Sequence, residues 1–355
     1  MAQKPSFPPT GAKRITVRDI AAQAGVHFTT VSLALRNHPR LPLATRRKIQ
    51  KIAARLGYRP DPMVTALNAY RSSSKPAKYQ ATIGWINNWP VQNELLSIPE
   101  FHEYFKGARS RTDELGYLLE EFWMHEPGLS GESLGRILRA RNITALLIAP
   151  QPFAATPLKL NYQELSAVAF GYSLKPSLLH VVTSHHFHSM NLIMGRLASY
   201  GYRRPGLIYP AAWDEKAENS CQGGMALAWR RWPELEPVNP LLKTEVSDAD
   251  IKDWVQAERP DSVISYNPMA DRLQTLGYRF PKDLGFVSLD LKHNETFLSG
   301  THQNDALIGR TAVDLLVAML HRGERGVPKT AIRTLVESIW LPGKTLARKT
   351  SRRAR

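Results

Sequence analysis

Apolar side chains recur at helical spacing in three short runs within residues 15–58. Thr16 can cap the first predicted helix, and Gly25 supplies the left-handed backbone conformation that ends it. A second helix begins near Phe28, and a third spans roughly residues 42–56, with Pro42 in its first turn. Small alanines on the first helix let the second approach closely, which predicts a helix-turn-helix. The predicted buried positions are Ile20, Ala21, Ala24, Val31, Ala34, Leu35, Ile49, Ile52, Ala53 and Leu56.

From residue 80 onward, patterns that predict strands alternate with patterns that predict amphipathic helices. Such alternation predicts an α/β fold with parallel sheets and crossover helices, and two successive series predict two lobes. The predicted strands are residues 81–87, 117–124, 143–150, 165–172, 204–210, 261–267 and 284–290. The predicted helices are residues 101–117, 131–142, 185–202, 221–233 and 267–278.

The charged residues are distributed unevenly along the chain, and this distribution predicts the kind of partner that the chain binds. The chain of 355 residues has a formal net charge of +16, and a chain of this length predicts two or three domains. Residues 1–80 hold 15 Lys and Arg against two Asp and Glu, and residues 344–355 hold six basic residues and no acidic one. A basic segment with helical patterning predicts a polyanion partner through phosphate neutralisation, whereas the basic tail is typical of a disordered arm.

Composition also sets the expected compartment. No run of roughly 18 apolar residues predicts a membrane span, and the first residues lack the apolar core of a secretory signal. The single cysteine, Cys221, excludes an intrachain disulfide framework and a cysteine-rich zinc site. We therefore expect a cytoplasmic, nucleoid-associated protein without a membrane partner.

The exposed face of the second helix is rich in small hydroxyl side chains. Residues near the start of such a helix reach base edges when the helix lies in the major groove, and Phe28 and Thr29 occupy that start. Thr30 and Ser32 are placed for phosphate oxygens. The alternative is a Ser/Thr-rich helical hairpin with no DNA role, and the basic charge of the segment favours double-stranded DNA as the partner.

Two segments here carry a family resemblance. ITVRDIAAQAGVHFTTVSLALR (15–36), followed by LGYRPDPMVTAL (56–67), resembles the headpiece and hinge of the lactose/galactose repressor family of bacterial transcription regulators. The resemblance implies that hinge helices, here within residues 62–70, pair over the minor groove and that Leu67 wedges between base pairs. The alternative is that Leu67 packs on the headpiece. The predicted DNA-binding residues are Thr16, His27, Phe28, Thr29, Thr30, Ser32, Leu33, Arg36, Tyr58 and Leu67.

The headpiece departs from the family pattern at three positions. Leu33 occupies the place of a common arginine, Arg36 that of a common asparagine, and His27 that of the usual serine cap. Leu33 cannot bond guanine in a bidentate manner but can contact a thymine methyl. We therefore expect a half-site that differs from the commonest family operator, and a less rigid entry to the second helix.

The body resembles the family's effector-binding domain, which is related to periplasmic sugar-binding proteins. The segments that carry the likeness begin at residues 277, 308 and 335 and read GYRFPKDLGFVSLD, IGRTAVDLLVAML and LVESIWLPGKTL. The resemblance runs over residues 15–346 and implies that the chain crosses between lobes near 182, 303 and 331. The expected divisions are an arm (1–13), a headpiece (14–60), a hinge helix and linker (61–79), an N-lobe (80–182 and 304–331), a C-lobe (183–303 and 332–343) and a basic tail (344–355).

Effector residues are expected at strand ends that face the cleft. A polyol ligand needs amide and carboxylate partners and an aromatic face, although each tryptophan could equally serve in packing. The resemblance places Asn267 at a position that bonds ligand hydroxyls. It also implies a clamping arginine three residues before a Gly-aromatic pair, yet AENSCQGGMAL has none, so a common monosaccharide held in the usual way is not expected. The predicted effector-binding residues are Asn87, Trp89, Trp213, Asn267 and Asp290.

Signatures of an enzyme are weak. His185 and His188 could share a helical face as metal ligands, but no carboxylate cluster accompanies them in the sequence, so an exposed helix start is the expectation. No nucleophile elbow, P-loop or dinucleotide fingerprint appears. We expect no catalytic residue, no metal and no cofactor.

The sequence thus predicts a DNA-binding transcription regulator, a repressor that acts as a homodimer on a palindromic operator. A small effector in the cleft, a sugar or sugar derivative, would control its operator affinity. The alternative is a solute-binding module that has lost DNA specificity.

Overall fold

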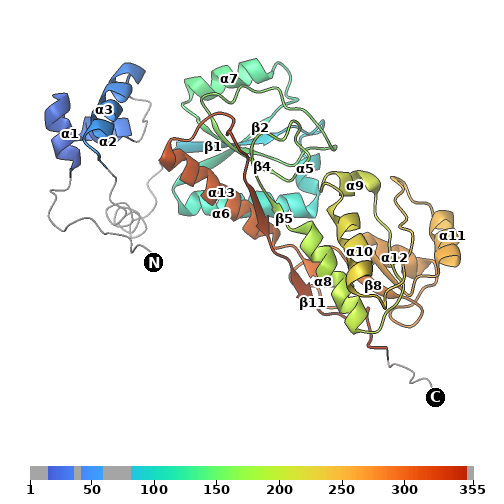
Figure 1. Cartoon of the computed structure of the whole chain (residues 1–355). Coiled ribbons are helices and arrows are strands. Elements are labelled where there is room, and N and C mark those ends of the chain that lie inside the picture. Colours follow the sequence, from blue (N-terminus) through green and yellow to red (C-terminus); the bar gives the residue numbers. More distant parts are fainter. Residues whose placement is uncertain (1–14, 36–40, 59–80, 350–355) are drawn as a thin grey trace, which may run out of the picture. The chain divides into compact units, whose positions relative to one another are not determined.

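The computed structural model describes residues 15–35, 41–58 and 81–349. The chain divides into two compact units, residues 1–78 with 318–324 and residues 79–317 with 325–355 (Figure 1). Several predictions lie outside the described residues: the arm, the hinge helix, Arg36, Leu67 and the tail beyond residue 349.

Three helices form the described part of the headpiece: α1 (Val17–Ala24), α2 (Phe28–Leu35) and α3 (Leu43–Arg55). Thr16 and Asp19 make a reciprocal capping box at α1, in which the Thr16 N–H donates to the Asp19 carboxylate over 2.7 Å. Gly25 ends α1 at a φ of 66°, a left-handed conformation that disfavours a side chain. These helices start and end close to the residues that the sequence pattern indicates.

The headpiece core contains the predicted apolar stripe, with Ala24, Leu35, Ile52 and Leu56 only partly buried at its edge. Gln50 on α3 donates its amide N–H to the Ala34 carbonyl over 2.9 Å and so joins α3 to the end of α2. The helix-turn-helix is therefore confirmed. Its buried residues are Ile20, Ala21, Val31, Ala34, Ile49 and Ala53.

The first lobe is built on a parallel sheet of six strands in the order β10-β5-β4-β3-β1-β2. Helices cross over from β1 to β2 and from β2 to β3, as the alternating sequence pattern predicts, whereas β3, β4 and β5 follow one another through connections without a helix. The strands are β1 (Ala81–Asn87), β2 (Tyr117–Trp123), β3 (Ala145–Ile148), β4 (Ser166–Phe170), β5 (His180–Ser184) and β10 (Arg333–Val336). The helices are α5 (Glu94–Ser97), α6 (Pro99–Glu114), α7 (Gly131–Ala140) and α13 (Asp305–Arg322).

Helices cover both faces of this sheet, with α7 on one side and α6 and α13 on the other (Figure 1). Ile86 packs in the cluster that contains the α7 leucines, whereas its neighbour Trp85 contacts Phe170 on the opposite face, with ring centroids 5.2 Å apart and planes tilted by 44°. At Gly107 and Gly309 a Cβ would lie about 2 Å from backbone oxygen of the facing helix, so α6 and α13 approach too closely for side chains there.

The second lobe has five strands in the order β11-β9-β8-β7-β6, parallel except for the β11–β9 pair. Successive residues of β7 point to opposite faces: Val263 belongs to one buried cluster and Ile264 to the other. The strands are β6 (Pro205–Leu207), β7 (Ser262–Ser265), β8 (Gly285–Ser288), β9 (Ser299–His302) and β11 (Ile339–Leu341). The helices are α8 (His186–Ser199), α9 (Ala211–Glu215), α10 (Ser220–Arg231), α11 (Asp248–Glu258) and α12 (Asn267–Thr275).

The third crossing between lobes differs from the prediction near residue 331. β10 still pairs with β5, with Val336 opposite Ser184, so the crossing follows Val336 and residues 333–336 belong to the first lobe. The prediction assigns residues 332–343 to the C-lobe, but β10 and β11 within this segment belong to different sheets. None of the helices in the described ranges has the length and apolarity of a transmembrane span.

Candidate functional site

An exposed corner lies at the start of α2. The Phe28 side chain is 45% exposed, and its ring centroid is 4.3 Å from that of His27. His27 Nδ1 lies 2.9 Å from the Thr29 hydroxyl and 3.5 Å from the Thr29 backbone nitrogen, so the histidine ring takes over the capping position that a serine commonly fills. Phe28 and Thr29 are thereby held outward on an ordered first turn.

The other predicted headpiece residues divide into outward and structural groups. Thr30, Ser32 and Leu33 are half-buried along α2. Thr16 is engaged as the α1 cap, and Tyr58 packs against the headpiece core. Among the described residues of this unit, exposed lysines and arginines lie on α3, at Arg47, Lys48, Lys51 and Arg55, and on α1, at Arg18.

Asn87, predicted as an effector ligand, is completely buried at the end of β1. Its amide nitrogen donates to the Gln92 carbonyl and to Glu121, both over 2.9 Å, while its oxygen accepts from the Trp89 backbone N–H over 3.0 Å. Both amide hydrogens are therefore used inside the first lobe. Asn87 holds the loop after β1 and is not a free ligand group.

Trp89 is also buried, with its indole N–H donating to the Pro150 carbonyl over 2.7 Å. The Lys216 ammonium, from the second lobe, lies 5.4 Å from the ring centroids of Trp89 and Phe101 and donates to the Pro152 carbonyl over 3.3 Å. Burial lowers the pKa of Lys216 to about 8. Lys216 thus connects the two lobes. This role was not predicted, because a single lysine after a short helix forms no recognisable sequence motif.

The predicted residues of the second lobe do come together at the carboxyl ends of β7 and β8. The Ser288 hydroxyl donates to Asn267 Oδ1, and it lies 3.2 Å from the Asp290 backbone nitrogen, which donates to it. Trp213 is 47% exposed and meets Tyr209 and Tyr266 edge-on, at centroid distances of 5.8 and 5.2 Å. An exposed aromatic ring and a set of amide, hydroxyl and carboxyl groups therefore occupy one edge of this sheet.

Asp305, which sequence analysis missed, lies beside Asp290. It is 5% exposed, and its Oδ1 has no hydrogen-bond partner. Burial, with the charges of Glu100 and Glu103, raises the pKa of Asp305 to about 7, and burial with the Asp305 charge raises that of Asp290 well above its usual range. The pair therefore holds a proton near neutral pH. An aspartate at the start of a helix is usually interpreted as a cap. The sequence therefore did not indicate that Asp305 would share a proton with Asp290.

An acid occupies the region where the resemblance implies a clamping arginine. Cys221 stands three residues before Gly224 and is buried. The fully buried Asp214 accepts from the backbone N–H groups of Cys221 and Gln222, over 3.0 and 3.1 Å, at the start of α10. The site therefore lacks a bidentate cation here and presents a helix-capping carboxylate instead.

The two histidines at the start of α8 have a carboxylate neighbour, contrary to the sequence-based expectation. Glu337, about 150 residues away in the chain, lies 2.9 Å from His185 Nδ1 and 3.2 Å from His188 Nε2. No local sequence pattern indicates this group, because its members meet only where the chain crosses between lobes.

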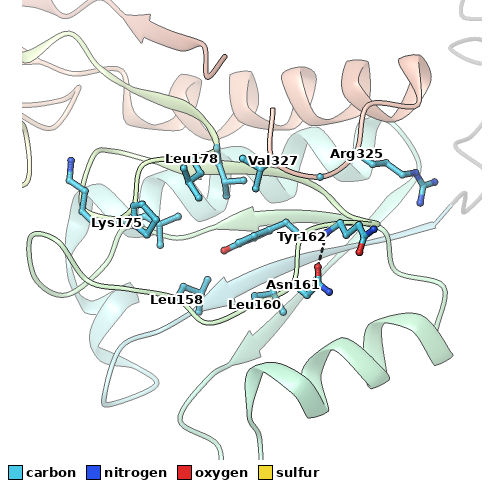
Figure 2. A pocket seen from close by; sticks show the side chains of 13 residues that line it. Leu158, Leu160, Asn161, Tyr162, Lys175, Leu178, Arg325 and Val327 are labelled. Carbon is cyan, nitrogen blue, oxygen red and sulfur yellow. Dashed lines mark hydrogen bonds between the residues drawn. The ribbon is translucent and has the colours of Figure 1, made fainter. Parts of the chain in front are cut away.

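A cavity of about 600 Å³ lies elsewhere, in the first lobe (Figure 2). Leu158, Leu160, Leu178 and Val327 form apolar walls around Tyr162, whose pKa burial raises to about 12. None of the predicted effector residues lines this cavity.

Comparison with known proteins connects these features. Residues 16–61 match the family described as bacterial regulatory proteins, lacI family. The HTH-type transcriptional regulator DegA of Bacillus subtilis is 29% identical over 104 residues, which cover 29% of this chain and 27% of that protein. This chain therefore spans little more than a quarter of that relative's length.

Solved structures resemble the whole chain in fold. The lac repressor dimer bound to operator and the anti-inducer ONPF is 18% identical with a TM-score of 0.55, and the complex of the regulator CelR with cellobiose is 19% identical with a TM-score of 0.56. Both matches cover 94% of this chain and 100% of the other. A lacI-family regulator from Enterococcus faecium with bound ribose is 15% identical, with a TM-score of 0.55 over 76% of this chain and 100% of that one.

A helix-turn-helix that matches the family at residues 16–61 is thus joined to a body with the two-lobed fold of these regulators. Residues 16–61 thus resemble the DNA-binding segment of lacI-family bacterial regulatory proteins, and the body resembles solved regulators of this kind in fold.

Proposed function

We propose that this regulator is a repressor that binds a palindromic operator as a homodimer and releases it in response to a small effector held between the lobes. The observation that carries the proposal is the exposed Phe28–Thr29 corner at the start of α2, on a unit with a basic α3. One headpiece reads one half-site, so pairing raises both affinity and specificity.

The second-lobe edge supports a polyol effector, a sugar or sugar derivative. Asn267 and Asp290 supply amide and carboxyl groups, and the exposed face of Trp213 can stack on a sugar ring. Asn87 is left out of this proposed site because its hydrogen bonds are used internally. Lobe closure around the effector would then change the dimer and its hold on DNA.

Fluorescence anisotropy with the full chain tests DNA recognition. A palindromic operator and a scrambled duplex are titrated at two salt concentrations. We expect at least about tenfold preference for the operator and an affinity that falls with salt, because phosphate contacts release counterions. Salt-dependent binding without preference would instead support a solute-binding module that carries a basic appendage.

The effector part is tested with the same operator complex and a panel of neutral sugars that includes ribose and cellobiose. We expect one of them to weaken operator binding, and Asn267→Ala to abolish that response while leaving effector-free binding intact. An unchanged response in Asn267→Ala would remove this residue from the site.

A further inference from the structure

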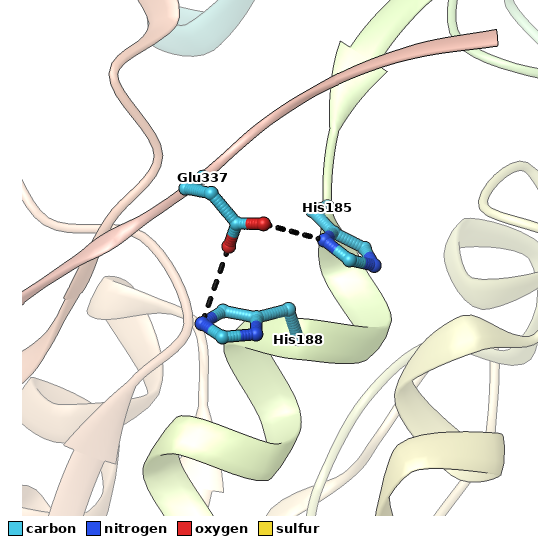
Figure 3. A group of neighbouring side chains, drawn as sticks. All are labelled: His185, His188 and Glu337. Carbon is cyan, nitrogen blue, oxygen red and sulfur yellow. Dashed lines mark hydrogen bonds and ion pairs between the residues drawn. The ribbon is translucent and has the colours of Figure 1, made fainter. Parts of the chain in front are cut away.

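The three places where the chain passes between lobes lie close together, and one carries two imidazoles. His185 and His188 lie at the start of α8, with ring centroids 5.4 Å apart. Figure 3 shows one oxygen of Glu337 directed at each ring, and the distances are 2.9 Å to His185 Nδ1 and 3.2 Å to His188 Nε2. We propose that His185, His188 and Glu337 bind a divalent transition-metal ion of the zinc type at this crossing.

The spacing of the three ligand atoms suits such an ion. All three lie within 4.8 Å of one another. Ligand atoms of a tetrahedral zinc ion are about 3.3 Å apart when each is about 2.0–2.1 Å from the metal. Two imidazole nitrogens and one carboxylate oxygen form a donor set that zinc accepts, with the remaining position open to water. Small side-chain shifts therefore suffice for an ion to replace the present hydrogen bonds.

The backbone around the three ligands is held in place by its own contacts. The His185 N–H donates to the Val336 carbonyl over 2.9 Å, and Asn304 donates its amide N–H to the Glu337 carbonyl over 2.7 Å. The buried hydroxyl groups of Ser189 and Ser338 lie 2.9 Å apart. These contacts position the ligands in advance, which lowers the cost of ordering them when an ion binds.

Exposure makes the group reachable from solvent. The side chains of His185, His188 and Glu337 are 29%, 48% and 58% exposed. An exposed pair of this kind contributes little to stability by itself. A bound ion would join the start of α8 to the segment after β10, and so would favour the lobe arrangement in which these two crossing segments meet.

Isothermal titration calorimetry of the full chain with zinc chloride tests the proposal, with magnesium chloride as the control ion because magnesium prefers all-oxygen sites. We expect one zinc site per chain, weakened at least about tenfold in both His188→Gln and Glu337→Gln, since loss of even a supporting partner typically weakens a metal site by 10–100-fold. A zinc-induced rise in the unfolding temperature should disappear in the same variants.

Two matched variants keep the test specific. His102→Gln removes another exposed histidine of the body and should leave zinc binding unchanged. His302→Gln alters the second group in the described residues whose ligand atoms lie within 4.8 Å, Asp290, His302 and Asp305, and should also leave it unchanged. No zinc binding by the parent chain, equal binding in His188→Gln, or a loss confined to His302→Gln would each overturn the proposal.

Discussion

The headpiece and the interlobe region differ in whether their predicted binding residues are exposed after folding. In the headpiece, Phe28 and Thr29 face outward from a turn that other residues hold in place. In the first lobe, Asn87 and Trp89 follow a strand end, as ligand residues often do, yet both are buried and hydrogen-bonded within the lobe. Position in an element is therefore insufficient evidence for a binding role, because the polar atoms must also be left over after folding.

The same contrast explains why one edge of the interlobe region remains a candidate. Asn267 and Asp290 belong to the second lobe and are only partly buried, and Trp213 exposes nearly half of its surface. The first lobe instead contributes aromatic rings that Lys216 already covers. An effector would thus be read mainly by the second lobe.

The largest expected effect comes from the headpiece core. Ile49→Ala should lower the free energy of unfolding of this unit by about 2–5 kcal/mol, because Ile49 is 1% exposed and its truncation leaves a cavity. A unit of this size cannot tolerate that loss, so operator binding should vanish. Calorimetry should still show the unfolding transition of the body; loss of both transitions would contradict the independence of the two units.

Asn87 and Asn267 form the next comparison. Asn87→Ala should destabilise the body by about 1–3 kcal/mol in urea unfolding, because it leaves the buried Trp89 backbone N–H without its hydrogen-bond acceptor. Asn267→Ala should cost less stability while removing the effector response. A swap of these two outcomes would show that Asn87 is the ligand residue.

Phe28→Ala should weaken specific operator binding by about 1–2 kcal/mol, roughly five- to thirtyfold, through loss of an apolar contact to a base edge. Binding to scrambled DNA should change much less, since phosphate contacts remain. Phe297→Ala is the matched control, because Phe297 is a phenylalanine of the body with 42% exposure. Parallel anisotropy titrations measure the operator affinity of both variants. Equal affinities would contradict the prediction.

The smallest expected effect is a pH dependence of stability from the Asp290–Asp305 pair. With its pKa raised to about 7, Asp305 holds a proton when folded that the unfolded chain releases above about pH 4. The stability of the parent should therefore fall as pH rises from about 4 to 7 and then level off. Asp305→Asn should reduce that fall, measured by urea unfolding at pH 5 and pH 8; identical curves would show that Asp305 ionises normally.

Much of the fold could be predicted because it follows local periodicity. The capping of α1 by Thr16, the turn at Gly25 and the exact span of β1 all rest on neighbouring residues. Strand β5 and helix α11 were not predicted, although Ser247 and Asp250 form a capping box that could have indicated α11. The third crossing was misplaced because strand pairing with β5, rather than local pattern, determines where β10 ends.

The candidate sites were less predictable because they depend on contacts between distant segments. Glu337 meets His185 across about 150 residues, and Lys216 reaches Trp89 from the other lobe. Neither contact has a local signature. The buried state of Asn87 likewise depends on Glu121, which lies in the next strand of the sheet.

The most direct test of the account is a DNase I footprint on genomic fragments with the parent chain and Phe28→Ala. The proposal that α2 reads one half-site of a palindromic operator predicts that the parent protects a symmetric site and that Phe28→Ala loses that protection at the same concentration. Absence of any symmetric protected site at every ionic strength, or equal protection by the two chains, would contradict the claim that this helix recognises an operator.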